Sequence, residues 1–152
     1  MTLLNDANKW IAALESGKYE QTSKQLKSIT VNSFCCLGVL CEVEDNVMWR
    51  ENVLVNSWSE CDIEGKIAYH NDDYPPSTVL NKYRLDDKLD DILNDKKDEY
   101  HSWCRENKVD PAIHGDIKSH LAYLNDEEGL SFSQIAEFLR LFYIPFIEED
   151  EE

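Results

Sequence analysis

The residues most able to do chemistry in this chain are three cysteines in one apolar run, FCCLGVLC, at residues 34–41. A thiol at the N-terminus of a helix is stabilised as the thiolate by the helix dipole. Cys35 or Cys36 would take that position if a helix begins near Ser33, and His70, from the strand-rich part that follows, could serve as the base. One function that these residues could support is therefore a hydrolase with a cysteine nucleophile.

The composition of the same run favours another interpretation, a buried segment of the core. Its other residues are apolar, and reduced cysteines commonly pack as small apolar side chains. Gly38 fits this interpretation, because a glycine lets another backbone segment approach closely. A structural zinc ion needs about four ligands at short spacings such as Cys-x-x-Cys, and the spacing of Cys35, Cys36 and Cys41 does not place two thiolates on one helix face. We expect no bound metal or cofactor.

A second candidate site lies in the polar segment at residues 18–27. The first thirty residues hold four lysines against three carboxylates, whereas the remainder of the chain has a net charge of −17. Ammonium and hydroxyl donors in such a segment can bind an anion. We interpret Lys18, Tyr19, Gln21 and Lys24 as candidate contacts for a small anionic ligand such as a nucleotide signal, with a structural hairpin as the alternative. The Gly-x-x-x-x-Gly-Lys spacing of a phosphate loop is absent.

The chain as a whole is acidic, with a net charge of −16 over 152 residues. Such a surface repels nucleic acid and anionic membranes, so we expect no direct binding to DNA or to a membrane. An acidic surface also speeds association with a basic partner, and it can imitate the charge of DNA. The candidate partner contacts are Asp86, Asp87, Asp90 and Asp91.

Apolar periodicity and turn signals predict an α+β fold with an N-terminal helix, a small antiparallel sheet and C-terminal helices. We expect one compact domain at residues 1–147 and an acidic tail at residues 148–152. The expected elements are a helix capped by Asp6, a short buried helix at residues 35–43, two or three strands within residues 47–70, a helix from Leu85 onward, a further helix around Leu121, and a last helix that begins with a Ser131–Gln134 capping box and ends at Pro145.

Three sequence blocks resemble, when taken together, a family of small uncharacterised proteins carried by bacteriophages and prophages. The blocks are WxxALxSGxYxQ at residues 10–21, FCCLGVLC at residues 34–41 and LNDxxGxSFxxIA at residues 124–136. The resemblance implies a viral accessory protein that acts in host takeover or against host defence, and it implies no particular activity. The five cysteines and the lack of a leader-like apolar stretch also predict reduced thiols and a cytoplasmic location, in the host cell if the protein is phage-encoded.

The function that we expect is binding to a host protein that presents a basic surface, without catalysis. Binding of a small anionic ligand at residues 18–27 and hydrolysis by Cys35 or Cys36 with His70 are the alternatives. The oligomeric state is left open by the sequence.

Overall fold

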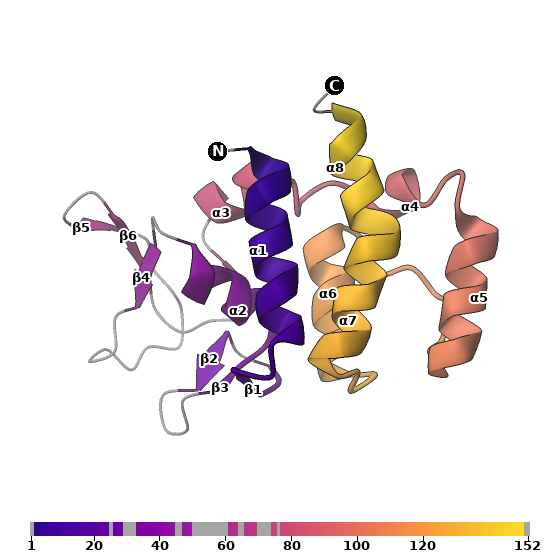
Figure 1. The fold of residues 1–152 in the computed structure, drawn as a ribbon, viewed down its shortest axis with the longest axis horizontal. Coiled ribbons are helices and arrows are strands. Elements are labelled where there is room, and N and C mark those ends of the chain that lie inside the picture. Colours follow the sequence, from indigo (N-terminus) through magenta and orange to yellow (C-terminus); the bar gives the residue numbers. More distant parts are fainter. Residues whose placement is uncertain are drawn as a thin grey trace.

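The structure is a computed structural model in which helices form most of the body and two small sheets lie toward one side (Figure 1). An N-terminal helix, small sheets and C-terminal helices together confirm the predicted α+β class. The residues that the structure describes are 2–24, 26–28, 33–44, 47–49, 61–63, 66–69, 74–75 and 77–150. His70, which the hydrolase alternative requires, lies outside the described residues.

The elements follow one another in an order that alternates short strands with helices before it becomes helical throughout. The helices are α1 (Leu3–Glu15), α2 (Cys36–Val43), α3 (Ser77–Lys82), α4 (Leu89–Ile92), α5 (Lys97–Asn107), α6 (Ile117–Asp126), α7 (Phe132–Phe138), the π-helical segment η1 (Leu139–Tyr143) and α8 (Ile144–Asp150). The strands are β1 (Glu20–Gln21), β2 (Lys27–Ser28), β3 (Ser33–Phe34), β4 (Val47–Trp49), β5 (Cys61–Ile63) and β6 (Lys66–Tyr69).

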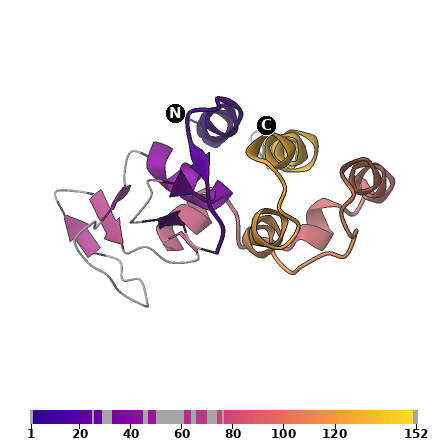
Figure 2. The same cartoon turned by 90° about the horizontal axis from the view of Figure 1, so that it is seen from below.

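The two sheets are mixed, whereas we expected a small antiparallel sheet. In the order β1-β3-β2, β1 runs parallel to the middle strand and β2 antiparallel to it. In the order β4-β6-β5, β4 is again the parallel partner. A parallel pair needs a crossover connection rather than a tight turn, and within the described residues neither parallel pair is formed by consecutive strands. Figures 1 and 2 both place β4–β6 at one end of the molecule and α5 at the other.

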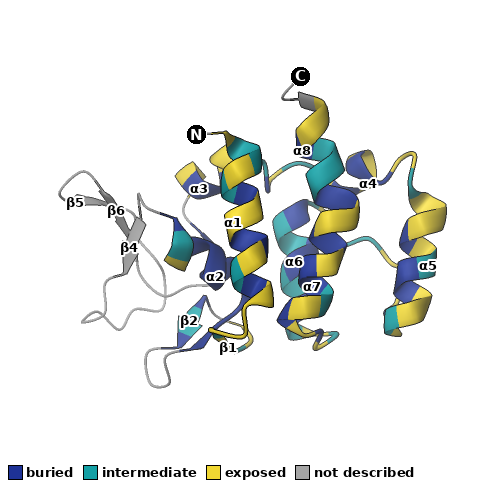
Figure 3. Ribbon diagram, in the orientation of Figure 1, coloured by how far each residue is buried: buried dark blue, intermediate teal, exposed yellow. Residues whose placement is uncertain are grey.

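The core is centred on Trp10 of α1. Helix α1 contacts α2, α7 and α8. The Trp10 side chain is fully buried, and its Nε1–H donates to the carbonyl of Cys36 at 3.0 Å. The rings of Tyr83 and Tyr143 meet the indole edge-on, at 6.3 and 6.0 Å between ring centres. In Figure 3 the ribbon of α1 carries both buried and exposed residues, as an amphipathic helix at the edge of a core does.

The cysteine-rich run forms the buried helix α2, as its apolar composition predicts. Gly38 lies on this helix against the backbone of Leu26, so closely that a Cβ atom there would be 1.8 Å from the Leu26 carbonyl oxygen. The same carbonyl accepts a hydrogen bond from the Cys35 amide at 3.2 Å. The close approach of Leu26 therefore requires a glycine at residue 38, as predicted from the sequence.

Several element boundaries differ from the sequence-based expectation. The N-cap of α1 is Thr2, and Asp6 lies in the first turn. The expected helix from Leu85 onward is divided into α4 and α5. Pro145 does not end the last helix, because the π-helical segment η1 precedes it and the Ile144 amide bonds to the Leu139 carbonyl, five residues earlier. The Ser131–Gln134 capping box is present, as predicted.

Candidate docking surface at the aspartate face

The structure brings together the four aspartates that the sequence analysis interprets as partner contacts. They are Asp86, Asp87, Asp90 and Asp91, which we call the aspartate face. Backbone bonds fix this segment to the residues around the start of α6. The Leu89 amide donates to the Gly115 carbonyl at 3.1 Å, and the Ile117 amide donates to the Asp87 carbonyl at 2.9 Å. The buried side chain of Leu89 also anchors the segment in the core, so the backbone that carries the four aspartates is held in place.

Two hollows adjoin the aspartate face, and they share Asp86 and Lys88. The smaller hollow has a volume of about 480 Å³ and is lined by Arg84, Asp86, Asp87, Lys88, Asp91, Ile92 and Phe146. The larger hollow has a volume of about 580 Å³ and is lined by Asp86, Lys88, Asp90, Ile113, Gly115 and Asp116. Each hollow thus combines carboxylates with apolar side chains, a combination that binds an amphipathic cation such as a lysine or arginine side chain.

Most of these carboxylates also form ion pairs within the chain. The pairs are Asp86 with Lys118, Asp87 with Arg84 and Asp90 with Lys97. Asp91 forms no ion pair with any described residue. Partial burial opposes the charge of Lys118, yet its hydrogen bonds to Asp116 and Asp86 prevail and raise its pKa. The net charge of the face is therefore modest, and the pairs fix the positions of its carboxylates.

Cys35 and Cys36 lie at the start of α2 and are buried there. Burial raises the pKa of Cys35 to about 12, and the amides of Gly38 and Leu37 offset only part of this rise. Burial also raises the pKa of Cys36 well above its ordinary value, and its thiol donates to the Leu121 carbonyl at 3.7 Å. Both thiols are therefore protonated near neutral pH, which suits packing rather than nucleophilic attack.

The candidate anion contacts at residues 18–24 lie near the loop between α6 and α7. The side-chain amide of Gln21 donates to Asn125 Oδ1 at 2.9 Å and to the Leu130 carbonyl at 2.8 Å. The backbone amide of Lys24 donates to Asp126 Oδ1 at 2.9 Å. The Lys18 ammonium lies 5.8 Å from the centre of the Tyr19 ring, and that ring packs edge-on against Phe34. Gln21 and the Lys24 backbone thus hold the segment to the protein, and the two ammonium groups of Lys18 and Lys24 lie on exposed residues.

Asn125 joins all three sequence blocks, a role that was not predicted from the sequence. Its Oδ1 accepts hydrogen bonds from the Cys36 amide at 3.2 Å and from Gln21, while its Nδ2 donates to the Thr22 carbonyl at 2.9 Å. Asn125 is 3% exposed, so these bonds satisfy a buried side chain. The sequence did contain a signal for this role. Asn125 lies in the third block beside apolar helix positions, and a polar side chain that is buried there needs hydrogen-bond partners.

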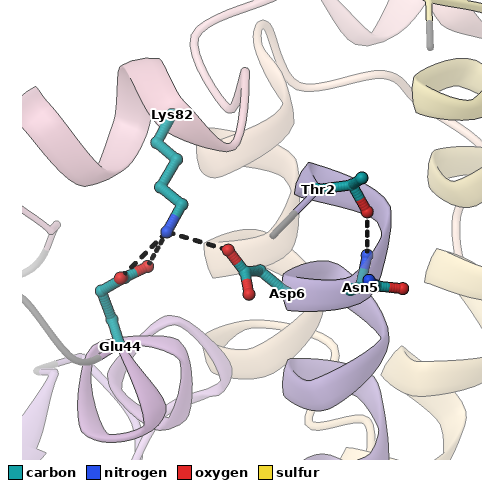
Figure 4. Close-up of polar contacts among 5 residues, drawn as sticks. All are labelled: Thr2, Asn5, Asp6, Glu44 and Lys82. Atoms are coloured by element: carbon teal, nitrogen blue, oxygen red, sulfur yellow. Dashed lines mark hydrogen bonds and ion pairs between the residues drawn. The ribbon is translucent and has the colours of Figure 1, made fainter.

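A second polar cluster links three helices near the N-terminus (Figure 4). The Lys82 ammonium lies 3.0 Å from Asp6 Oδ2 and 3.0 Å from Glu44 Oε1. The Glu44 side chain is only 5% exposed, so its charge depends on this partner. Although partial burial opposes it, hydrogen bonding to Asp6 and Glu44 raises the pKa of Lys82. Asp6, Glu44 and Lys82, which we call the clamp, hold the end of α2 to α1 and α3.

A histidine pair lies between α5, α6 and α7. His120 is fully buried, its Nδ1 accepts from the His114 amide at 3.3 Å, and its Nε2 lies 3.2 Å from the Tyr100 hydroxyl. The His114 ring stacks on Tyr123 with 3.7 Å between ring centres. Among the described residues, no group of three or more His, Cys, Asp or Glu side chains has an arrangement that could hold a metal ion. No described helix has the length and apolar character needed to cross a bilayer.

Comparison with known proteins identifies the family of the chain. No curated protein and no solved structure matches it significantly. A family model described as "Domain of unknown function (DUF8296)" matches residues 5–141, a range that includes the three sequence blocks, the clamp and the aspartate face. The chain therefore belongs to the DUF8296 family.

Proposed function

We propose that the protein is a phage-type accessory protein that acts by binding a host protein through the aspartate face. The observation that carries this proposal is the pair of hollows, whose linings combine carboxylates with Ile92 and Phe146 in one hollow and with Ile113 in the other. A lysine or arginine of the partner could lay its aliphatic stem against these apolar side chains and extend its charged group to a carboxylate. The resemblance of the three sequence blocks to phage and prophage proteins supports a host protein as the partner.

The charge of the whole chain supports the same type of partner. A net charge of −16 favours encounter with a basic surface, while the fixed carboxylates of the face supply local contacts. Such a surface resembles DNA in its charge, which makes a nucleic-acid-binding host enzyme a suitable target. Buried thiols with raised pKa values favour this binding function over the hydrolase alternative.

The test compares two variants that each replace four acidic side chains. The face variant carries Asp86→Asn, Asp87→Asn, Asp90→Asn and Asp91→Asn. The control variant carries Asp95→Asn, Asp98→Asn, Glu99→Gln and Glu106→Gln, at exposed positions on and before α5. Both variants change the net charge from −16 to −12, so a difference in binding between them does not come from net charge.

Partners are captured from host lysate with each variant, identified by mass spectrometry, and their affinities are measured as a function of salt concentration. We expect the face variant to lose at least about tenfold in affinity and to show a weaker salt dependence, while the control variant binds as the wild type does. Equal losses in both variants would show that net charge alone drives binding. Unchanged binding by the face variant would place the partner elsewhere on the surface. Either result overturns the proposal.

A further inference from the structure

The lining of the smaller hollow includes a guanidinium group, which belongs to Arg84 of the chain itself. The Arg84 Cζ atom lies 4.3 Å from the centre of the Phe146 ring. Its Nε and Nη2 atoms both donate to Asp87, at 3.1 and 2.8 Å. The face of an aromatic ring and a carboxylate are both groups that bind a guanidinium ion well. Phe146 and Asp87 therefore provide the chemistry of an arginine site beside the hollow, and Arg84 of this chain occupies that site.

The contact between Arg84 and Asp87 has a geometry that an incoming arginine could improve. Both donors bond to the same Asp87 oxygen, Oδ2, whereas the strongest arginine–carboxylate pairs use both oxygens in parallel. Arg84 also has a φ of +57°, a backbone conformation that any substitution at this position must tolerate. Its side chain is 33% exposed, so water reaches the contact. An arginine from outside that binds in the favoured geometry could compete with such a side chain.

The rest of the hollow suits a second arginine side chain. Ile92, 8% exposed, offers an apolar surface for the aliphatic stem. Asp91 lines the same hollow and forms no ion pair with a described residue, so its carboxylate can accept from an incoming guanidinium. A planar, weakly hydrated guanidinium stacks on an aromatic ring better than an ammonium does.

We propose that this hollow is an arginine-specific site for the partner, and that Arg84 acts as an internal competitor which the partner's arginine displaces from Phe146. The inference rests on the proposed function, because it names the side chain that the aspartate face recognises. It differs from general attraction of basic groups, since it predicts a preference for arginine over lysine and a role for one aromatic ring.

The first experiment uses short peptides that differ only in carrying arginine, lysine or glutamate. Affinities are measured at low salt, and the contacted residues are mapped by backbone amide chemical shifts. We expect the arginine peptide to bind about threefold to fivefold more tightly than the lysine peptide and to shift the amides of residues 84–92 and α8. The glutamate peptide should not bind. Phe146→Leu keeps an apolar side chain but removes the ring, and it should abolish the preference for arginine.

The second experiment tests displacement with a matched pair of variants. Arg84→Asn and Lys88→Asn each remove one positive charge from the lining of the same hollow, and asparagine tolerates the positive φ at residue 84. Arg84→Asn should tighten binding of the arginine peptide about threefold or more beyond the effect of Lys88→Asn. Equal effects would show that Arg84 contributes only its charge, and they would overturn the competitor role.

The outcomes also separate this inference from the proposed function. If the arginine and lysine peptides bind equally at the hollow, and Phe146→Leu changes neither affinity, the arginine site is wrong and the docking surface stands. If neither basic peptide shifts the amides of residues 84–92, both the arginine site and the docking surface are overturned.

Discussion

At the scale of single residues, His120 makes the stability of the fold depend on pH. Its Nδ1 accepts a hydrogen bond from the His114 amide, so the neutral ring carries its proton on Nε2, next to the Tyr100 hydroxyl. Burial is the main cause that lowers the pKa of His120 to about 4, and the neighbouring His114 adds to it. Protonation would bury a charge and remove the acceptor of the His114 amide, so the folded state binds this proton far less readily than the unfolded chain does.

This depressed pKa predicts a loss of stability at mildly acidic pH. Between pH 6.5 and about 4 the unfolded chain is protonated at His120 while the folded protein is not, so the free energy of unfolding falls as the pH falls through this range. The full contribution, about 3 kcal/mol, is present above pH 6.5. Urea unfolding measured at several pH values between 4 and 7.5 tests this expectation.

A matched histidine variant isolates the contribution of His120 from that of the carboxylates. His120→Asn retains an oxygen acceptor near the position of Nδ1 but does not titrate, so its stability should change less with pH than that of the wild type. His101→Asn removes an exposed histidine of α5 and should leave the pH dependence of the wild type unchanged. The same slope in both variants would contradict the assignment of the effect to His120.

At the scale of elements, the contact between α2 and Leu26 decides how the cysteine-rich run is packed. Alanine is about 1 kcal/mol more favourable than glycine in a helix interior, so Gly38→Ala would stabilise an isolated helix. In this fold the new Cβ atom would overlap the Leu26 carbonyl, and the helix or the strand region would have to move. We therefore expect Gly38→Ala to destabilise the protein by about 3 kcal/mol or more, measured by urea unfolding. A stabilised variant would show that α2 does not approach Leu26 as described.

The elements also show how far sequence reasoning reaches. The apolar run predicted the buried helix α2, and the spacing of Ser131 and Gln134 predicted a capping box that is present. The prediction that the last helix ends at Pro145 was wrong, because one wider turn of π-helix can absorb a missing amide donor. Buried side chains on both sides of Pro145 also hold the helix in place. Local patterns therefore predicted the elements where local interactions dominate and failed where tertiary packing overrides a helix-breaking residue.

The candidate site shows the same division between local and long-range information. The sequence identified the four aspartates as a charged face, because their charges are adjacent in the chain. It did not predict the hollows, since Phe146 and Asp116 reach the face from distant segments. Asn125 was missed for the same reason, because each of its partners in the first two blocks lies about ninety or more residues away along the chain.

At the scale of the whole molecule, the net charge of −16 gives folding and binding opposite responses to salt. Negative charges repel one another more strongly in the compact state than in the unfolded chain, and salt screens this repulsion within a Debye length of about 10 Å at 0.1 M. The ion pairs described at the surface oppose this effect only weakly, because exposed pairs contribute little. Raising the concentration of potassium chloride from about 0.02 to 0.2 M should therefore raise Tm by roughly 2–5 °C.

The same change should weaken capture of a basic partner, since it screens the attraction between the two surfaces. Differential scanning calorimetry and binding measurements in the same buffers test both directions. A Tm that falls with salt would mean that ion pairs such as those of the clamp outweigh the net repulsion. Partner binding that is insensitive to salt would remove the electrostatic basis of the docking surface.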